Sequence, residues 1–159
     1  MELELLTRLQ QAMHDDDVVA MVITPGADLQ YIAGYDAKPL ERLTALVIPH
    51  TASPALIAPA LEAGEAREST FARNGGEVIT WSETQDPFLI VANLVDDGVS
   101  GAIAVDDHMW AQRVLRLRQV LRDRPQVLAG SILNDLRQKK TAREIALLQE
   151  AAVAIKSVH

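Results

Sequence analysis

The sequence contains no cysteine, so it can form neither a disulfide framework nor a thiolate metal site. Aromatic residues make up only 4% of the 159 residues, although 48% are hydrophobic, so we expect an aliphatic core. No apolar run reaches the roughly 18 residues that span a bilayer. The first ten residues lack the basic start and apolar stretch of a signal peptide. These absences predict a cytoplasmic protein with no membrane partner.

Basic residues are fewer than acidic ones: 15 lysines and arginines stand against 22 aspartates and glutamates, which gives a net charge of −7. An acidic surface repels phosphate backbones, so we expect no nucleic-acid partner. Charged residues make up 23% of the chain, too few for a disordered protein with this apolar content. The length is typical of one domain, or of one domain with a trailing element.

Apolar runs bounded by turn residues predict the elements of the first half. The run 18–23 ends at a Thr-Pro-Gly turn and indicates a buried strand. Two short runs, 43–48 and 55–58, are joined by a proline-bounded loop and predict a hairpin. Helical spacing predicts three helical segments, over 3–14, 27–34 and 61–70. We expect Gly34 to close the second of these in a left-handed conformation.

Strands and helices alternate in the second half. Strands are predicted over 77–81, 101–105 and 126–129, and helices over 86–97, over 107–121 and from 131 onward. Asp86 and Pro87 are typical of a helix cap and first helical position, and Asp107 is expected to cap the next helix. Alternation favours parallel strands, and the hairpin adds an antiparallel one. The sequence therefore predicts an α/β fold, a three-layer α/β/α sandwich with a mixed five- or six-stranded sheet.

The last segment predicts a helix with apolar residues on more than one face. Thr141 and Glu144 form a capping box, and Ile145 and Leu148 begin one apolar face. Leu147 widens this surface. The pattern leaves two explanations open: the helix folds onto its own domain, or it is covered by a partner that the sequence does not contain.

Three stretches together resemble the amino-terminal domain of the creatinase/prolidase/aminopeptidase P family. DLQYIAGY at 28–35 is similar to the family's (N/D)-x-x-Y-L-(T/S)-G-(F/Y) element. RLTALVIP at 42–49, followed by PALIAPALE at 54–62, is similar to its hairpin. LRQKKTAREIALLQEAA at 136–152 resembles its junction with the catalytic domain, except that Ala142 stands where the family usually has proline.

The resemblance implies a ribonuclease-H-like sheet of order 3-2-1-4-5, with strand 2 antiparallel and a possible sixth strand at the edge. It implies an amino-terminal domain over 1–138 and a junction helix over 139–159 that leads to a catalytic domain in cis. The implied parent is a homodimeric Xaa-Pro peptidase that cleaves proline-containing peptides with two divalent ions (manganese, cobalt or zinc). The family's metal ligands lie in the catalytic domain, so the resemblance carries no catalytic residue, metal ligand or cofactor over to this chain.

One dense cluster of metal-type ligands, Asp106-Asp107-His108, follows a predicted strand. It could hold a metal ion, but Asp107 equally fits a helix cap, and adjacent strand residues point to opposite faces. Asp15-Asp16-Asp17 similarly fits a solvated turn better than a calcium loop. The sequence contains no nucleophile elbow, P-loop or dinucleotide-binding motif.

The segment 35–42 offers the remaining candidate site. In the family, this domain often borders the active site of the dimer partner. By that resemblance, we expect the border of the substrate cleft to include six residues: Tyr35, Asp36, Lys38, Arg42, His108 and Trp110. A solvated connector is the alternative for the segment, and half-buried packing is the alternative for Trp81 and Trp110.

Three hypotheses for function follow. The first is a non-catalytic domain of an Xaa-Pro metallopeptidase that shapes substrate access and subunit association. The second is a free-standing peptide- or protein-binding module with the same fold. The third is an unrelated small α/β enzyme that uses Asp106, Asp107 or His108.

Overall fold

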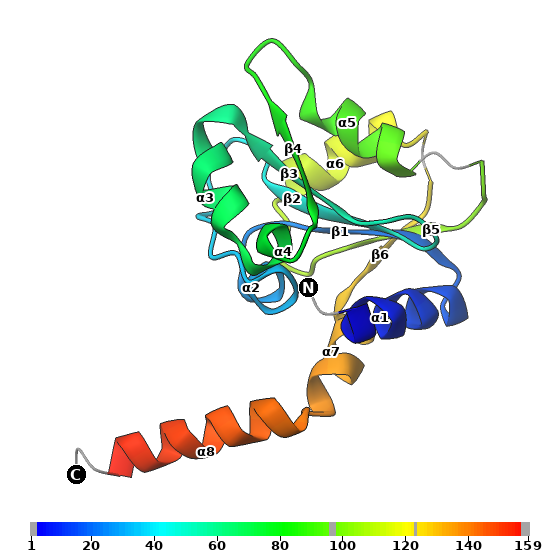
Figure 1. The fold of residues 1–159 in the computed structure, drawn as a ribbon. Helices are drawn as coiled ribbons and strands as arrows, with labels where there is room; N and C mark the ends of the chain where they lie inside the picture. The colour runs from blue at the N-terminus through cyan, green and yellow to red at the C-terminus, as the bar shows by residue number, and fades with distance from the viewer. Residues whose placement is uncertain (1–2, 96–97, 123, 157–159) are drawn as a thin grey trace.

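The computed structural model describes residues 3–95, 98–122 and 124–156, and a six-stranded sheet forms its centre (Figure 1). The strands lie in the order β4-β3-β2-β1-β5-β6. Their bounds are β1 (Val18–Ile23), β2 (Ala45–Pro49), β3 (Ala55–Pro59), β4 (Glu77–Trp81), β5 (Ala102–Val105) and β6 (Gln126–Leu128). β2 pairs antiparallel with β1 and β3, whereas the other neighbours pair in parallel, so β2 runs against the rest.

This topology confirms the expected sheet. With the edge strand β4 set aside, the order β3-β2-β1-β5-β6 is the predicted order 3-2-1-4-5, and its second strand is the antiparallel one. β4 supplies the sixth strand, parallel to β3. The hairpin predicted in the first half is the β2–β3 pair, in which Leu46 lies opposite Leu56.

Helices cover both faces of the sheet. Their bounds are α1 (Leu3–Asp15), α2 (Ala27–Ala33), α3 (Ala63–Glu68), α4 (Thr70–Arg73), α5 (Pro87–Val95), α6 (Ala111–Val120), α7 (Gly130–Gln138) and α8 (Ala142–Lys156), with a 3-10 turn η1 (Ala60–Glu62) before α3. Buried side chains of α1, α2, α3, α4 and α7 form one core with the sheet, and those of α5 and α6 form a second core on the opposite face. The molecule is therefore the predicted three-layer sandwich.

The inner position of β1 in the sheet explains why the sequence of this strand is continuously apolar. All six residues of β1 are buried. Met21 and Ile23 join the first core, whereas Ala20 and Val22 join the second. A strand that is covered on both faces needs apolar residues at every position rather than at alternate ones.

Two helix predictions differ from the structure. The segment 61–70 is a broken unit, because Ser69 is extended between α3 and α4 and its hydroxyl accepts a hydrogen bond from Ala72 N at 3.2 Å. The helix expected from Asp107 begins at Ala111 as α6. Asp107 instead accepts a hydrogen bond from the backbone N–H of Gly130, at the start of α7.

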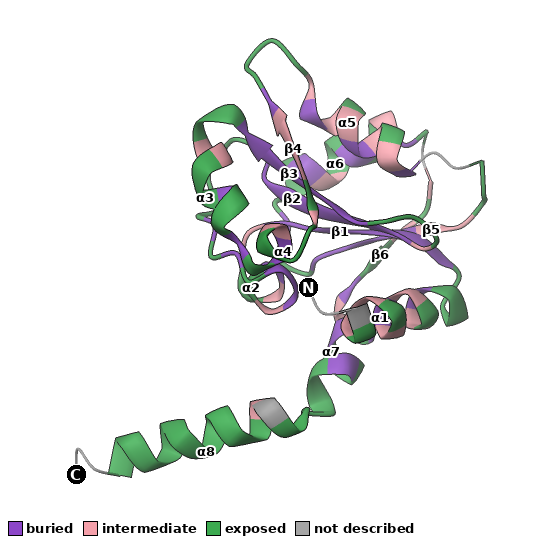
Figure 2. Cartoon of the chain, in the orientation of Figure 1, coloured by how far each residue is buried: buried purple, intermediate pink, exposed green. Residues whose placement is uncertain are grey.

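The last helix, α8, extends away from the sandwich (Figure 1), and almost its whole surface is exposed (Figure 2). Its capping box is confirmed: Thr141 N donates to Glu144 Oε2 at 2.7 Å, and Glu144 N donates to Thr141 Oγ1 at 3.2 Å. Five large apolar side chains of α8 are at least 47% exposed: Ile145, Leu147, Leu148, Val153 and Ile155. Of the two explanations left open for this helix, folding onto its own domain is not what the described residues show.

Candidate functional site

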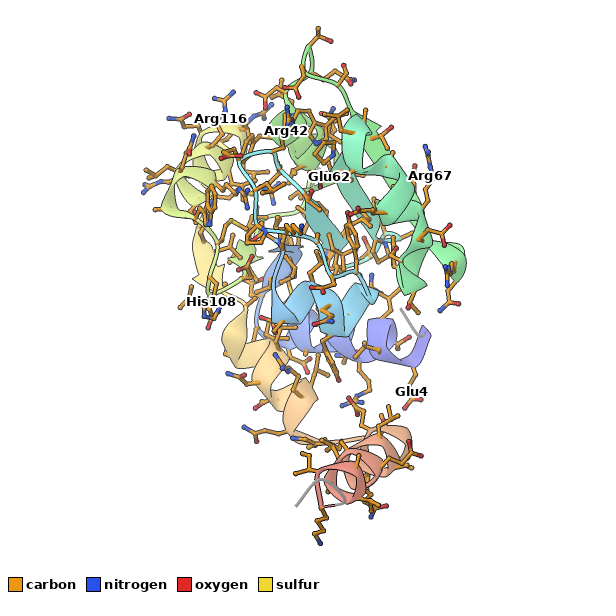
Figure 3. The ribbon with its side chains drawn as sticks, turned by 90° about the vertical axis from the view of Figure 1, so that its left-hand side faces the viewer. Glu4, Arg42, Glu62, Arg67, His108 and Arg116 are labelled. Atoms are coloured by element: carbon orange, nitrogen blue, oxygen red, sulfur yellow. The ribbon has the colours of Figure 1, made fainter. Side chains whose placement is uncertain are left out.

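A cleft of about 790 Å³ opens between the segment before β2, the loop after β4, and α6. Its walls carry three acidic and three basic side chains: Glu41, Arg42, Glu83, Asp86, Arg113 and Arg116. Its apolar lining includes Leu43, Trp81 and Phe88. In Figure 3, Arg42 and Arg116 lie in the upper part of the molecule, whereas His108 lies lower, at the left.

Two ion pairs cross the surface of this cleft. Arg42 Nε lies 2.6 Å from Glu83 Oε1, which joins the segment before β2 to the loop after β4. Arg116 Nη2 lies 2.5 Å from Asp86 Oδ2, which joins α6 to the start of α5. Arg42 Nε donates a hydrogen bond to Glu83, and this bond raises the pKa of the Arg42 guanidinium.

Beneath these pairs lies Arg113, which is only 4% exposed although it lines the cleft. Its Nη2 donates to the backbone carbonyl of Leu40, and the carbonyl of Arg42 lies 3.4 Å away. Its guanidinium stacks on the Trp110 ring, 4.6 Å from the centroid. Burial lowers the pKa of Arg113, and the charge of Asp106 partly opposes this shift. Arg113 therefore ties α6 to the end of the 35–42 segment.

The residues expected at the cleft border lie in different environments. Tyr35 is a core residue, 5% exposed, and its hydroxyl has no hydrogen-bond partner among the described residues. Burial, followed by the charges of Glu62 and Glu65, raises the pKa of Tyr35 to about 12. Asp36 and Lys38 are exposed. Tyr35 thus contributes packing to the segment, while its charged neighbours face solvent.

The structure brings together two of the expected border residues. Arg42 and Trp110 both contact Arg113, the first through its carbonyl and the second through its ring. His108 is exposed and lies apart from Arg42 (Figure 3). Trp81 is 7% exposed, and its Nε1 donates to the Leu43 carbonyl at 2.9 Å, so it packs as the alternative interpretation expects.

The cluster Asp106-Asp107-His108 is divided among separate contacts. Asp106 Oδ2 accepts from Thr24 N at 2.8 Å and from Thr24 Oγ1 at 2.5 Å, which joins the carboxyl ends of β1 and β5. Asp106 Oδ1 accepts a hydrogen bond from His108 N. Asp107 Oδ1 accepts one from Gly130 N at the start of α7. Within the described parts of the chain, no group of three or more His, Cys, Asp or Glu side chains could hold a metal ion.

Sequence analysis missed Arg113, Glu83 and Arg116. A signal for Arg113 is present, because it lies four residues before Leu117, on the buried side of α6, where an apolar residue is expected. Glu83 and Arg116 carry no such signal, because exposed charges are common on loops and helices.

The model of the Creatinase/Prolidase N-terminal domain matches residues 6–139. The chain belongs to this family. The creatinase/prolidase N-terminal domain described here is 40% identical, over 148 residues, to a probable dipeptidase PepE of Mycobacterium tuberculosis. It is 30% identical, over 155 residues, to an Xaa-Pro dipeptidase of Lactobacillus helveticus. These matches cover 93% and 92% of this chain but only 39% and 40% of the relatives, so the chain spans about two fifths of their length.

Solved structures show the same fold. The dipeptidase PepE of Mycobacterium ulcerans matches with a TM-score of 0.86 and 38% identity, over 98% of this chain and 42% of that one. The creatinase/prolidase N-terminal domain of an X-Pro dipeptidase from Streptococcus pyogenes matches with a TM-score of 0.71 and 16% identity. That match covers 84% of this chain and 99% of the solved one, and it supports the fold alone.

In this creatinase/prolidase N-terminal domain, two of the stretches that carry the family resemblance meet. Asp28 Oδ1 of α2 lies 2.6 Å from Arg137 Nη1 of α7, and the Arg137 guanidinium lies over the Tyr31 ring. Burial raises the pKa of Tyr31, and the nearby Glu144 carboxylate raises it further. The end of α7 is therefore held on α2 by an ion pair and a cation–π contact. None of the described helices is both long and apolar enough to cross a membrane.

Proposed function

We propose that this chain is the non-catalytic N-terminal domain of a longer dipeptidase-type peptidase that cleaves Xaa-Pro substrates. One observation carries the proposal: nearly the whole chain aligns with relatives that are named as dipeptidases, and it covers about two fifths of the length of each. In a peptidase of this length, the catalytic residues belong to the part that this chain does not cover. We also propose a cytoplasmic location, in keeping with the absence of cysteine.

We further infer that residues 1–138 form the domain and that 139–159 connect it to a catalytic domain in cis. The exposed apolar residues of α8 support this, because a helix that is apolar on several faces is normally covered by other elements. The capping box and the contacts of α2 with Arg137 support a defined start for the connection.

The segment 35–42 is the part of the domain that we propose as a border of the substrate cleft, in a homodimer where it faces the partner's catalytic domain. Arg42 is exposed at the end of this segment, and buried Arg113 fixes the backbone on which it stands. A fixed backbone lets an exposed guanidinium meet a peptide carboxylate at low entropic cost. Asp36, Lys38, His108 and Trp110 are the further exposed candidates.

We assign the two divalent ions of the proposed peptidase, whether manganese, cobalt or zinc, to the catalytic domain. The chemistry of the present residues supports this assignment, because the Asp106 and Asp107 carboxylates are already engaged by backbone and hydroxyl donors. An engaged carboxylate would have to exchange these hydrogen bonds for a metal.

Proline release from an Xaa-Pro dipeptide tests the proposal. With added manganese or cobalt, we expect no turnover by the 159-residue chain and turnover by a protein that extends it to the length of the relatives. In the longer protein, Arg42→Ala should raise KM or lower kcat/KM, whereas Arg73→Ala, an exposed arginine outside the cleft, should not. Turnover by the 159-residue chain itself would overturn the assignment.

A free-standing binding module remains a second candidate. It is favoured by the cleft of about 790 Å³, because residues of this chain alone line it. The length of the natural reading frame separates the two functions: continuation into a metal-binding domain excludes the free-standing module.

A further inference from the structure

The guanidinium of Arg113 is a buried charge in the wall of the cleft, and the charge of Asp106 offsets its burial only in part. Only 4% of Arg113 is exposed, and no carboxylate among the described residues forms an ion pair with it. Its described acceptors are two backbone carbonyls, and both contact Nη2. A guanidinium has five N–H donors, and these acceptors occupy only Nη2. Among the described residues, Tyr35 Oη is the buried side-chain polar atom without a partner, so the remaining Arg113 donors are open to solvent in the cleft. Buried charges are normally paired, because burial without a counter-charge is costly.

The cleft supplies a place where an anion can reach this group. Arg113 is one of its lining residues, and the cleft volume of about 790 Å³ falls within the usual range of small-molecule sites. Burial lowers the pKa of Arg113. A carboxylate that bound the open donors would restore part of the charge stabilisation that burial removes.

The other lining residues indicate what the anion is attached to. Glu41 and Glu83 place negative charge at the mouth, and Glu83 uses only Oε1 in its pair with Arg42. The three carboxylates of the lining offset its three guanidiniums, so the cleft favours a ligand that carries both charges over a dianion such as phosphate. Trp81 and Phe88 add an apolar surface between the charges. The combination suits a molecule with a carboxylate, an ammonium and an aliphatic group.

We propose that this cleft binds a small zwitterion, a free α-amino acid or a dipeptide, whose carboxylate pairs with Arg113 and whose ammonium meets Glu41 or Glu83. The exposed pair of Arg42 with Glu83 is weak enough to open, because solvent and salt screen exposed ion pairs. The site belongs to this domain alone and does not rest on the role proposed for the domain in a peptidase.

Intrinsic fluorescence gives a direct readout. The chain has two tryptophans, and both are at the site: Trp81 lines the cleft and Trp110 stacks on Arg113. We would titrate the 159-residue chain with leucine, with Ala-Leu, with the carboxamide of Ala-Leu and with its N-acetyl derivative. We expect saturable changes with leucine or Ala-Leu, with Kd on the order of millimolar for ligands of this size. The tighter of the two shows whether the cleft prefers a free amino acid or a dipeptide.

Removing either charge of the ligand should weaken binding by about tenfold or more, because each charge-assisted contact is lost. Arg113→Gln should have the same effect, while Arg118→Gln on the same helix, outside the cleft lining, should bind as the unmodified chain does. Circular dichroism checks that Arg113→Gln folds. If it does not fold, the carboxamide comparison on the unmodified chain decides.

Three results would overturn the proposal. The first is the absence of saturation with both leucine and Ala-Leu, and the second is equal affinity for Ala-Leu and its carboxamide. The third is unchanged affinity in a folded Arg113→Gln variant. None of these results bears on whether a longer protein hydrolyses Xaa-Pro bonds, so the two proposals fail separately.

Discussion

Gly130 shows how a contact between distant residues can require a glycine. A Cβ at this position would lie 2.1 Å from Asp107 Oδ2, whose partner Oδ1 accepts the Gly130 N–H at 2.8 Å. We predict that Gly130→Ala displaces the Asp107 carboxylate and lowers the free energy of unfolding by about 1–3 kcal/mol. Urea denaturation measures the change.

Gly64 provides the matched control, since it lies in α3 and a Cβ there would meet no heavy atom within 4 Å. Gly64→Ala should be neutral or stabilising by up to about 1 kcal/mol. Adding Asp107→Ala to Gly130→Ala should recover part of the loss if steric conflict is its cause. Equal loss in the single and double variants would contradict this explanation.

The hydroxyl of Tyr35 leads to a prediction about alkaline pH. The folded protein keeps this phenol neutral up to a pKa of about 12, whereas the unfolded chain releases the proton near the ordinary pKa of 10. The free energy of unfolding should therefore fall as the pH rises from 10 to 12. Tyr35→Phe should flatten this fall. It should be neutral or slightly stabilising at pH 7, because it removes a buried hydroxyl that has no hydrogen-bond partner among the described residues.

Denaturation of the wild type and Tyr35→Phe at several pH values isolates this contribution, because all other titrating groups are common to both proteins. Destabilisation by more than about 1 kcal/mol at pH 7 would show that the hydroxyl has a partner. The sequence could not reveal the burial of Tyr35. Its segment, between Gly34 and Leu43, contains four charged residues and a proline, and the ring becomes part of the core only through contacts formed in the folded chain.

At the scale of a single element, the first turn of α8 depends on Thr141. Thr141→Ala removes the acceptor of the Glu144 N–H and should cost the helix start about 1 kcal/mol. We expect faster hydrogen exchange at the amides of Glu144 and Ile145, with no change in the core strands. Thr51→Ala, at an exposed threonine between β2 and β3, should leave these amides unchanged.

Acid should loosen the same turn in the wild type. Backbone and side-chain hydrogen bonds from Thr141 lower the pKa of Glu144. The carboxylate contact is therefore complete above its ordinary pKa of 4.5 and is lost as the pH falls through the lowered value. Protection factors of the Glu144 and Ile145 amides, corrected for the intrinsic pH dependence of exchange, should fall in this range. Constant protection factors would contradict the capping role of Glu144.

The strands were more predictable than the helices for a physical reason. β1 and β4 have the bounds expected from sequence, because turn residues stand at both ends of short apolar runs. The predicted start of α6 differs from the structure because Asp106 and Asp107 accept hydrogen bonds from Thr24, after β1, and from Gly130, in α7. These contacts join distant segments and cannot be read from the local sequence. The cleft was hidden for the same reason, since it joins loops from three parts of the chain.

For the whole molecule, α8 should contribute almost nothing to the stability of the sandwich. A chain that ends at Gln138 should have the same free energy of unfolding as the full chain, within about 0.5 kcal/mol, because α8 leaves its apolar residues exposed. A chain that ends at Ala129 should lose at least about 4 kcal/mol, because it lacks three buried side chains of α7: Ile132, Leu133 and Leu136. Equal destabilisation by both truncations would contradict the division at residue 138.

The position of β1 in the sheet also sets the order in which the domain can assemble during translation. β1 pairs with β2, and β2 pairs with β3, through neighbouring parts of the chain. The other edge of β1 is covered only when β5 has been made, as the pairing of Met21 with Ala104 shows. The ribosome delivers β1 to β4 first, and the long loop that closes β1 onto β5 slows the final step. The nascent chain should therefore hold a half-sheet with one open apolar edge at β1, which is the point where a chaperone has most to protect.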